Sequence, residues 1–255
     1  MGHEAQGIPT SPSSMVVRVI TGHVVSSGSM VSRAYLADSW RGIVVAAPEG
    51  THWLACTFDA LAPDEDGLLT RGEAESGLPR AYARATLTKI VVGWFGSGGP
   101  TDEPIEITIA NPAVFRHPQG APIGVVALNR SRDFAQHLEA GTGPWLHALT
   151  DTDSAPERFN VETLLDTGDG SSWPVNRAAW PSPVSGGDFL GQSGAMALDV
   201  ALRDEDAGSP AFGSGDAGRV LMGVVRPVGS NVAMLLPTRL IAETVAHAQA
   251  GDGLH

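Results

Sequence analysis

The chain has 255 residues, and its composition excludes several classes of protein. Apolar residues make up 42% and charged residues 17%, with 31 Gly and 18 Pro, which argues against a coiled coil, a helical bundle or a disordered chain. The net charge is −12 and the 16 basic residues are scattered, so we expect no nucleic-acid binding. No apolar run is long enough to span a membrane, and no secretory signal is recognisable. Because Cys56 is the only cysteine, we expect no disulfide framework and a cytoplasmic location.

Short apolar runs rich in β-branched residues dominate the first half of the chain, with Gly, Pro, Ser or Asp between most of them. Such a pattern is typical of a β-sandwich or β-barrel. We expect strands at Met15–Val25, Met30–Leu36, Ile43–Ala47, Trp53–Phe58, Ala81–Trp94, Ile105–Ala110 and Ile123–Leu128. These runs predict a first β unit over residues 15–128, preceded by a flexible leader over residues 1–14.

A polar stretch over residues 129–160, with weak helical signals near Phe134–Leu138, predicts a crossover linker. Strand-like runs then resume and predict a second β unit over residues 161–236; they are Val161–Leu165, Ala195–Leu202, Val220–Val225 and Val232–Leu236. Between them, the Pro-rich segment Ser172–Val184 predicts an exposed loop with two tryptophans that could contact a partner. Pro237 and a following apolar stripe predict a helix over residues 237–250.

The segment Asp204–Val225, DEDAGSPAFGSGDAGRVLMGVV, resembles the nucleophile loop of chymotrypsin/trypsin-like serine proteases. In that family a G-D-S-G-S/G-P loop precedes a short strand, a turn and an apolar strand. The matching residues are Asp206, Gly208, Ser209 and Pro210. Ala207 stands at the nucleophile position and Glu205 at the first glycine. The resemblance implies an all-β fold of two antiparallel six-stranded β-barrels with a C-terminal helix.

Two further segments resemble those that present the other members of the triad. Gly42–Pro48, GIVVAAP, resembles the strand ending in T-A-A-H, with Pro48 at the histidine position. His117–Leu128, HPQGAPIGVVAL, resembles the segment that presents the aspartate, with Gly124 at the aspartate position. None of Pro48, Gly124 and Ala207 has a side chain that can act as base, acid or nucleophile, so the resemblance implies a degenerate triad.

The function implied is that of an intracellular bacterial pseudoprotease, a serine protease homologue that takes part in a regulatory or defence system. Such a domain would hold a protein or an extended peptide in the cleft between its barrels, with no cofactor, metal or membrane. The oxyanion loop would be Glu205, Asp206, Ala207 and Gly208. The binding residues would be Asp204, Gly223, Val224, Val225 and Arg226.

Other interpretations remain open at this stage. The chain could be a serine endopeptidase, a hydrolase whose nucleophile is replaced by Ala207 and whose base is His23 or His52. Ser193, in the turn-like GQSG, is an alternative nucleophile. A third hypothesis is a generic β-rich structural or binding subunit. Residues 62–73 resemble an acidic calcium loop, but Ala62 stands at the first ligand position, so we expect a solvated acidic turn.

Overall fold

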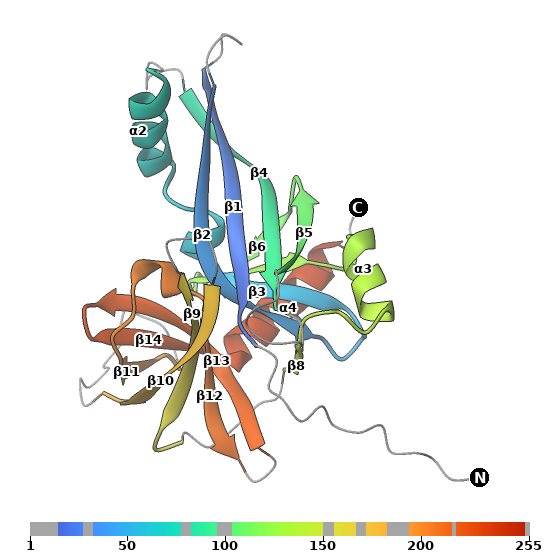
Figure 1. The fold of residues 1–255 in the computed structure, drawn as a ribbon, viewed down its shortest axis with the longest axis vertical. Coiled ribbons are helices and arrows are strands. Elements are labelled where there is room, and N and C mark those ends of the chain that lie inside the picture. Colours follow the sequence, from blue (N-terminus) through green and yellow to red (C-terminus); the bar gives the residue numbers. More distant parts are fainter. Residues whose placement is uncertain are drawn as a thin grey trace.

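A curled eight-stranded sheet forms the first half of the molecule (Figure 1). The computed structural model describes residues 15–27, 33–77, 83–95, 104–149, 156–166, 172–182, 194–215 and 218–252. The strands are β1 (Val17–Ser27), β2 (Arg33–Ala46), β3 (His52–Thr57), β4 (Ala83–Trp94), β5 (Ile105–Ala110), β6 (Val114–Arg116), β7 (Ile123–Ala127) and β8 (Leu146–Ala148). Their order is β5-β4-β1-β2-β3-β7-β6, and β8 pairs with β2 in parallel.

This first sheet corrects the expected six-stranded barrel, because it curls without closing. The terminal strands β5 and β6 do not pair with each other in the described part of the chain. The short link between them contains Asn111, which has a positive φ of 47°, and β6 pairs with β7 instead. The result is a half-barrel.

The strands β1, β2 and β4 are long and extend beyond the half-barrel as a projection (Figure 1). Helix α2 (Glu65–Ser76) packs on this projection, and its Leu68 and Leu69 cluster with Val25 and Leu36. Asp64 caps the helix, because its side chain accepts the N–H of Gly67. The expected acidic turn is therefore a helix, in which Asp64 already has a structural function.

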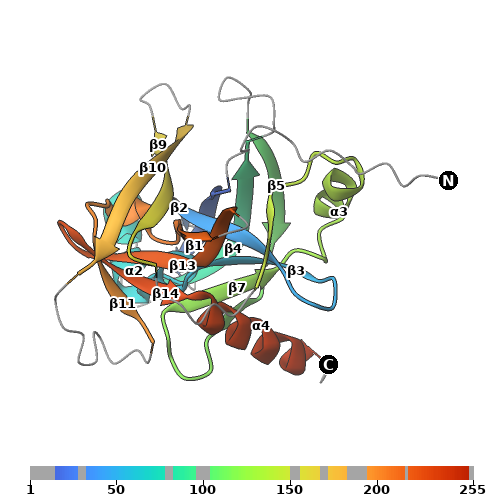
Figure 2. The ribbon, with the colours of Figure 1, turned by 90° about the horizontal axis from the view of Figure 1, so that it is seen from below.

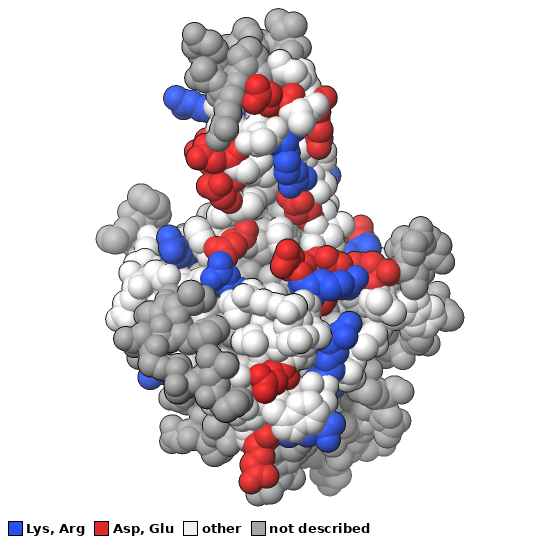
Figure 3. All heavy atoms as spheres, turned by 90° about the vertical axis from the view of Figure 1, so that its left-hand side faces the viewer, with Lys and Arg blue, Asp and Glu red and all other residues white. Residues whose placement is uncertain are grey.

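The exposed face of α2 is acidic. Figure 3 shows Asp and Glu side chains gathered over this projection, with both signs of charge interspersed below it. The exposed acids of this helix and its cap are Asp64, Glu65, Asp66, Glu73 and Glu75. Such a surface favours basic over acidic partners.

The second half of the molecule is a closed six-stranded barrel, as expected. Its strands are β9 (Phe159–Asp166), β10 (Ser172–Pro181), β11 (Met196–Asp199), β12 (Pro210–Gly215), β13 (Gly218–Gly229) and β14 (Val232–Pro237), in the order β10-β11-β14-β13-β12-β9. The expected loop over Ser172–Val184 is wrong for residues 172–181. These residues form β10, which pairs with β9, and Trp173 lies directly opposite Leu165.

The crossover contains two elements, α3 (Arg132–Glu139) and β8. Since β8 returns to pair with β2, part of the crossover belongs to the first sheet. Helix α4 (Thr238–Asp252) confirms the expected C-terminal helix and lies along the lower side of both units (Figure 2). One apolar core joins the first sheet, the second barrel and this helix, and includes Ile43, Val125, Phe212, Leu236, Ile241 and Val245. No described helix combines the length and the apolarity that crossing a membrane requires.

Candidate functional site at the junction of the two barrels

The loop with the nucleophile-like sequence meets the first sheet at Arg41 and Cys56. The N–H of Arg41 donates to the carbonyl of Ala207 over 3.2 Å, and the thiol of Cys56 lies 3.9 Å from the same oxygen. On its other side, the N–H of Gly208 donates to the carbonyl of Val225 over 2.9 Å. Ala207 therefore lies at the junction of β2, β3 and β13.

Asp206 anchors this loop to the second barrel. Its carboxylate is fully buried and accepts the hydroxyl of Thr163 and, over 2.9 Å, the N–H of Arg203. The Arg203 guanidinium lies 3.6 Å from the carboxylate. The loop conformation is thus held by a buried, hydrogen-bonded charge.

The backbone N–H of Ala207, at the nucleophile position, already donates a hydrogen bond within the loop. Residues Asp204–Asp206 form a short 3₁₀ helix, and the N–H of Ala207 donates to the carbonyl of Asp204 over 3.1 Å. Acyl transfer requires donors aimed at the oxyanion that develops on the substrate. In this conformation Ala207 supplies neither a nucleophilic atom nor a free oxyanion donor.

Across from the loop, the short helix α1 (Phe58–Leu61) follows directly after β3. Asp59 of this helix forms an ion pair with Arg226 of β13, which bridges the half-barrel and the closed barrel. Gly124 of β7 pairs with Cys56, and a Cβ atom at Gly124 would lie 3.3 Å from Phe58 Cα and 2.8 Å from Leu61 Cδ1. The aspartate-like position therefore faces α1, and Leu61 fills the space that its side chain would need.

Comparison with solved structures identifies the architecture. A thermostable serine protease from an extremophilic microorganism superposes with a TM-score of 0.52 at 10% identity, over 92% of this chain and 98% of that one. The protease Anisep from Arthrobacter nicotinovorans gives a TM-score of 0.51 at 14% identity, over 93% and 98%. Catalytically active tobacco etch virus protease complexed with product gives a TM-score of 0.50 at 12% identity, over 98% and 84%. The fold is that of the trypsin-like serine proteases. No family model and no curated protein matches the sequence.

Within this trypsin-like fold, the assignment of Pro48 to the histidine position is wrong. Pro48 lies in the turn between β2 and β3, just beyond the pair Ala46 and His52. Along an extended strand, seven residues separate it from Arg41 by about 23 Å. The strand whose end reaches Ala207 is β3, through Cys56, and it ends at Thr57, directly before Phe58 and Asp59 of α1. The apolar run Trp53–Phe58 predicts this strand, but Gly42–Pro48 resembles the family's histidine motif more closely.

The two alternative bases, His23 and His52, also lie far from Ala207. His52 is four residues from Cys56 on β3, which corresponds to about 13 Å, and its ring packs on Phe134 at 5.6 Å. His23 lies five residues along β1 from the strand partner of Arg41, at a distance of about 17 Å. Neither imidazole can reach a hydroxyl at position 207, so the endopeptidase hypothesis loses both of its candidate bases. Ser193 lies outside the described residues.

The other described histidines either contact other side chains or are exposed away from the Ala207 loop. His117 is 2.9 Å from Glu243 of α4, His137 is 3.0 Å from the Thr142 hydroxyl, His147 packs against Phe212, and His247 is exposed on α4. Within the described part of the chain, no three His, Cys, Asp or Glu side chains gather as a metal site would require.

The predicted binding residues divide into two groups. Arg226 lies at the junction, and Asp204 is exposed on the 3₁₀ helix. Gly223, Val224 and Val225 are buried within β13, where Val224 and Val225 belong to apolar cores. These three cannot line a cleft, which corrects the expectation for them.

Cys56 is not a substitute nucleophile. Its thiol is fully buried and donates to the carbonyl of Arg41 over 2.8 Å. Burial raises the pKa of Cys56 to about 12, so the reactive thiolate is absent at neutral pH.

A buried arginine beside the loop joins the first sheet to the second barrel. The Arg41 guanidinium donates to Asp166 over 2.7 Å and to the carbonyl of Leu164 over 3.1 Å. Burial by itself would raise the pKa of Asp166, but hydrogen bonds from Ser172 and Arg41, with the charges of Arg41 and Arg203, lower it. Asp166 therefore stabilises the fold as the ionised carboxylate.

Asp166→Asn is expected to lower the free energy of unfolding by about 1–3 kcal/mol, because it leaves the buried Arg41 charge without its counter-ion. Asp166 is 37% exposed, which limits the loss. The difference from the wild type should shrink as the pH falls below the ordinary carboxyl pKa of 3.8, and it should vanish only below the lowered pKa of folded Asp166, where the carboxyl is protonated in both states. Urea unfolding measures the effect. Asp38→Asn, which breaks the exposed pair with Arg71, is the control and should cost less than about 1 kcal/mol.

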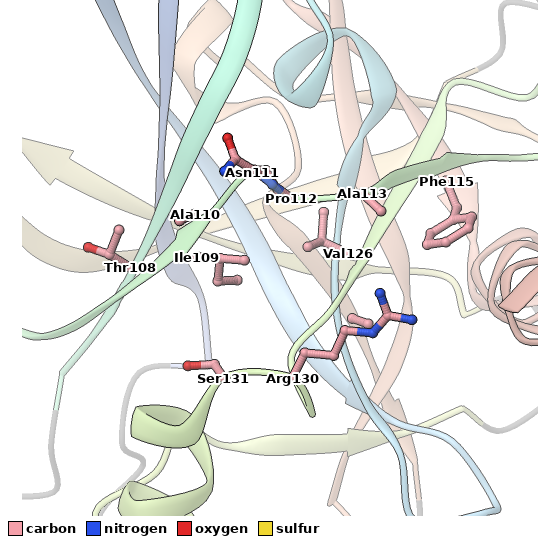
Figure 4. Close-up of a pocket in the computed structure, with 11 residues that line it drawn as sticks. Thr108, Ile109, Ala110, Asn111, Pro112, Ala113, Phe115, Val126, Arg130 and Ser131 are labelled. Carbon is pink, nitrogen blue, oxygen red and sulfur yellow. The ribbon is translucent and has the colours of Figure 1, made fainter. Parts of the chain in front are cut away.

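A separate hollow lies at the open edge of the half-barrel (Figure 4). It has a volume of about 200 Å³ and is lined by the link after β5, by Phe115 and Val126, and by Arg130 and Ser131. Among the described residues that line it, Arg130 is the only charged one, and the Ser131 hydroxyl accepts the N–H of Phe134 at the start of α3. The hollow therefore lacks the acid–base pair that hydrolysis requires.

Proposed function

We propose that this chain is a pseudoprotease, a trypsin-like scaffold that binds a segment of a partner protein at the junction of its barrels. The proposal rests on the residues that stand where the catalytic groups of a protease would lie. Ala207 has no nucleophilic atom and its N–H bonds to Asp204, while the Asp59–Arg226 ion pair bridges the two barrels beside it.

The fold supports this proposal because the stabilising contacts of the loop remain. Asp206 is buried and hydrogen-bonded, and Gly208 bonds to Val225. A junction that has these stabilising contacts but no catalytic groups among the described residues is suited to binding a partner protein.

The backbone favours recognition by side chains over addition of a strand. Both the N–H and the carbonyl of Val225 bond to residues 208 and 209. In a regular strand the next residue with the same orientation is Pro227, which has no N–H to donate to a docking strand. Next to it, Val228 is 37% exposed and Arg226 presents a partly exposed guanidinium. Because Asp59 already neutralises Arg226, the partner segment is expected to present an apolar residue, which packs on Val228.

No described histidine lies within reach of position 207, so we predict that a serine hydroxyl at this position will not be reactive. Ala207→Ser and the unaltered chain are treated with a fluorophosphonate, and intact mass is measured. Neither should gain the phosphonyl mass, because a serine without a general base and an oxyanion hole is a weak nucleophile. A labelled Ala207→Ser chain would show that a base exists and would support the endopeptidase. Circular dichroism checks that the variant is folded.

Binding is tested separately with a phage-displayed library of random dodecapeptides selected on the purified chain. Selected peptides should bind at least tenfold more weakly to Val228→Asp, because the substitution places a charge on the proposed apolar contact. Tyr35→Asp, at an exposed aromatic residue on the projection, is the matched control and should bind normally. Equal binding to all three chains, or no selected peptide, would contradict the proposal.

A further inference from the structure

A second cavity, of about 310 Å³, lies between the projection and the half-barrel. Its walls come from three places: residues 61–63 and Leu68 next to and on α2, Ala85 and Leu87 of β4, and Pro112 and Val114 around the β5–β6 link. All of these side chains are apolar. The cavity is open to solvent on one side, and its volume is sufficient for a molecule with a single aromatic ring.

One buried polar side chain lines this apolar cavity. His23 of β1 is 3% exposed, and its Nδ1 atom has no hydrogen-bond partner. A buried polar atom without a hydrogen-bond partner is energetically unfavourable. Because the His23 side chain forms part of the cavity wall, its imidazole can contact a molecule that enters.

The charges around His23 belong to neighbouring elements. Asp38 of β2 pairs with Arg71 of α2 over 2.8 Å, and Glu65, which also borders the cavity, is exposed at the start of α2. Burial lowers the pKa of His23, with Asp38 opposing this effect and Arg71 adding to it. The imidazole is thus neutral at pH 7 and can accept or donate a hydrogen bond, depending on its tautomer.

We propose that this cavity binds a small uncharged molecule with an apolar body and one hydroxyl group, which hydrogen-bonds to the imidazole of His23. The apolar walls select the body, and a hydroxyl suits either tautomer because it both donates and accepts. This site is independent of the proposed recognition at the barrel junction. It needs neither Ala207 nor Arg226.

The test uses two probes of nearly equal shape, 4-ethylphenol and ethylbenzene, with titration calorimetry and the NMR signals of the His23 ring. We expect 4-ethylphenol to bind and to shift the His23 signals. His23→Phe should weaken 4-ethylphenol about tenfold and leave ethylbenzene unchanged, because only the hydrogen bond is lost.

A second variant tests the cavity itself. Ala85→Trp places an indole in the cavity and should abolish binding of both probes. Ala74→Trp, on the exposed face of α2, is the matched control and should bind as the wild type does. Absence of binding to the wild-type chain at millimolar probe, or unchanged binding in His23→Phe or Ala85→Trp, would overturn the proposal. Thermal unfolding of each variant checks that it is folded.

Discussion

Gly208→Ala is expected to lower the free energy of unfolding by about 3 kcal/mol or more, since strain and overlap add. Gly208 has a φ of +93°, which residues with a Cβ rarely adopt. A Cβ atom would also overlap the carbonyl oxygen of Arg41 and lie 2.6 Å from Cys56 Sγ. The overlap is with the backbone of β2, so relief requires the barrels to separate locally. Urea unfolding measures the loss.

Gly77→Ala is the control for Gly208→Ala, because it introduces backbone strain without steric overlap. Gly77 ends α2 with a φ of +67°, and no atom lies within 4 Å of the position that a methyl group would take there. This substitution should cost only about 1 kcal/mol, because the backbone strain acts alone. Equal losses for Gly77→Ala and Gly208→Ala would contradict the close approach of the Ala207 loop to Arg41.

A loss of stability on acidification is expected from His147. Its ring lies 5.4 Å from that of Phe212, so it connects β8 with the second barrel, and its Nε2 is buried without a hydrogen-bond partner. Burial, with a smaller effect of Arg219, lowers the pKa of His147 from 6.5 to about 4. The unfolded chain therefore binds more protons than the folded chain between these values. The free energy of unfolding should fall by about 3 kcal/mol as the pH drops from 6.5 to 4.

His147→Phe should remove most of this pH dependence, because phenylalanine keeps the contact with Phe212 and cannot be protonated. Urea unfolding at several pH values between about 4.5 and 7 measures the slope. The pKa of His23 is also lowered, so a smaller slope should remain. His247→Phe, on the exposed face of α4, is the control and should retain the wild-type slope. An unchanged slope in His147→Phe would contradict the burial of a neutral imidazole at this contact.

The parts of the fold that local pattern could predict share a physical origin. Alternating or continuous apolar runs between turn residues marked most of the strands, since burial imposes that pattern on each strand by itself. The stripe after Pro237 predicted α4, because helical spacing also appears within one short segment. The motif around Asp206 and Gly208 predicted the trypsin-like fold, since a buried carboxylate and a positive φ restrict the residues allowed there.

The assignment of Pro48 shows where local pattern fails. Residues 42–47 and 53–57 are both buried, β-branched or apolar strand segments, and nothing in their composition says which strand end meets the loop. The choice depends on contacts between distant residues, from Arg41 and Cys56 to Ala207. Helix α2 was missed for a related reason, because its weak apolar stripe gains stability from packing on Val25 and Leu36.

The resemblance of the segment around Asp206 and Gly208 to trypsin-like serine proteases predicted the closed second barrel. Residue pattern was sufficient to predict the strand-rich class and the C-terminal helix, and it shows that position 207 has no serine. These properties follow from local burial patterns and from side-chain chemistry. Long-range packing was needed to show that the first barrel stays open, that His23 and His52 lie far from Ala207, and that Asp59 faces Arg226. It also placed His23 in an apolar cavity. Each of these depends on which strands pair and which ends meet, and such contacts are set by the packing of the whole chain.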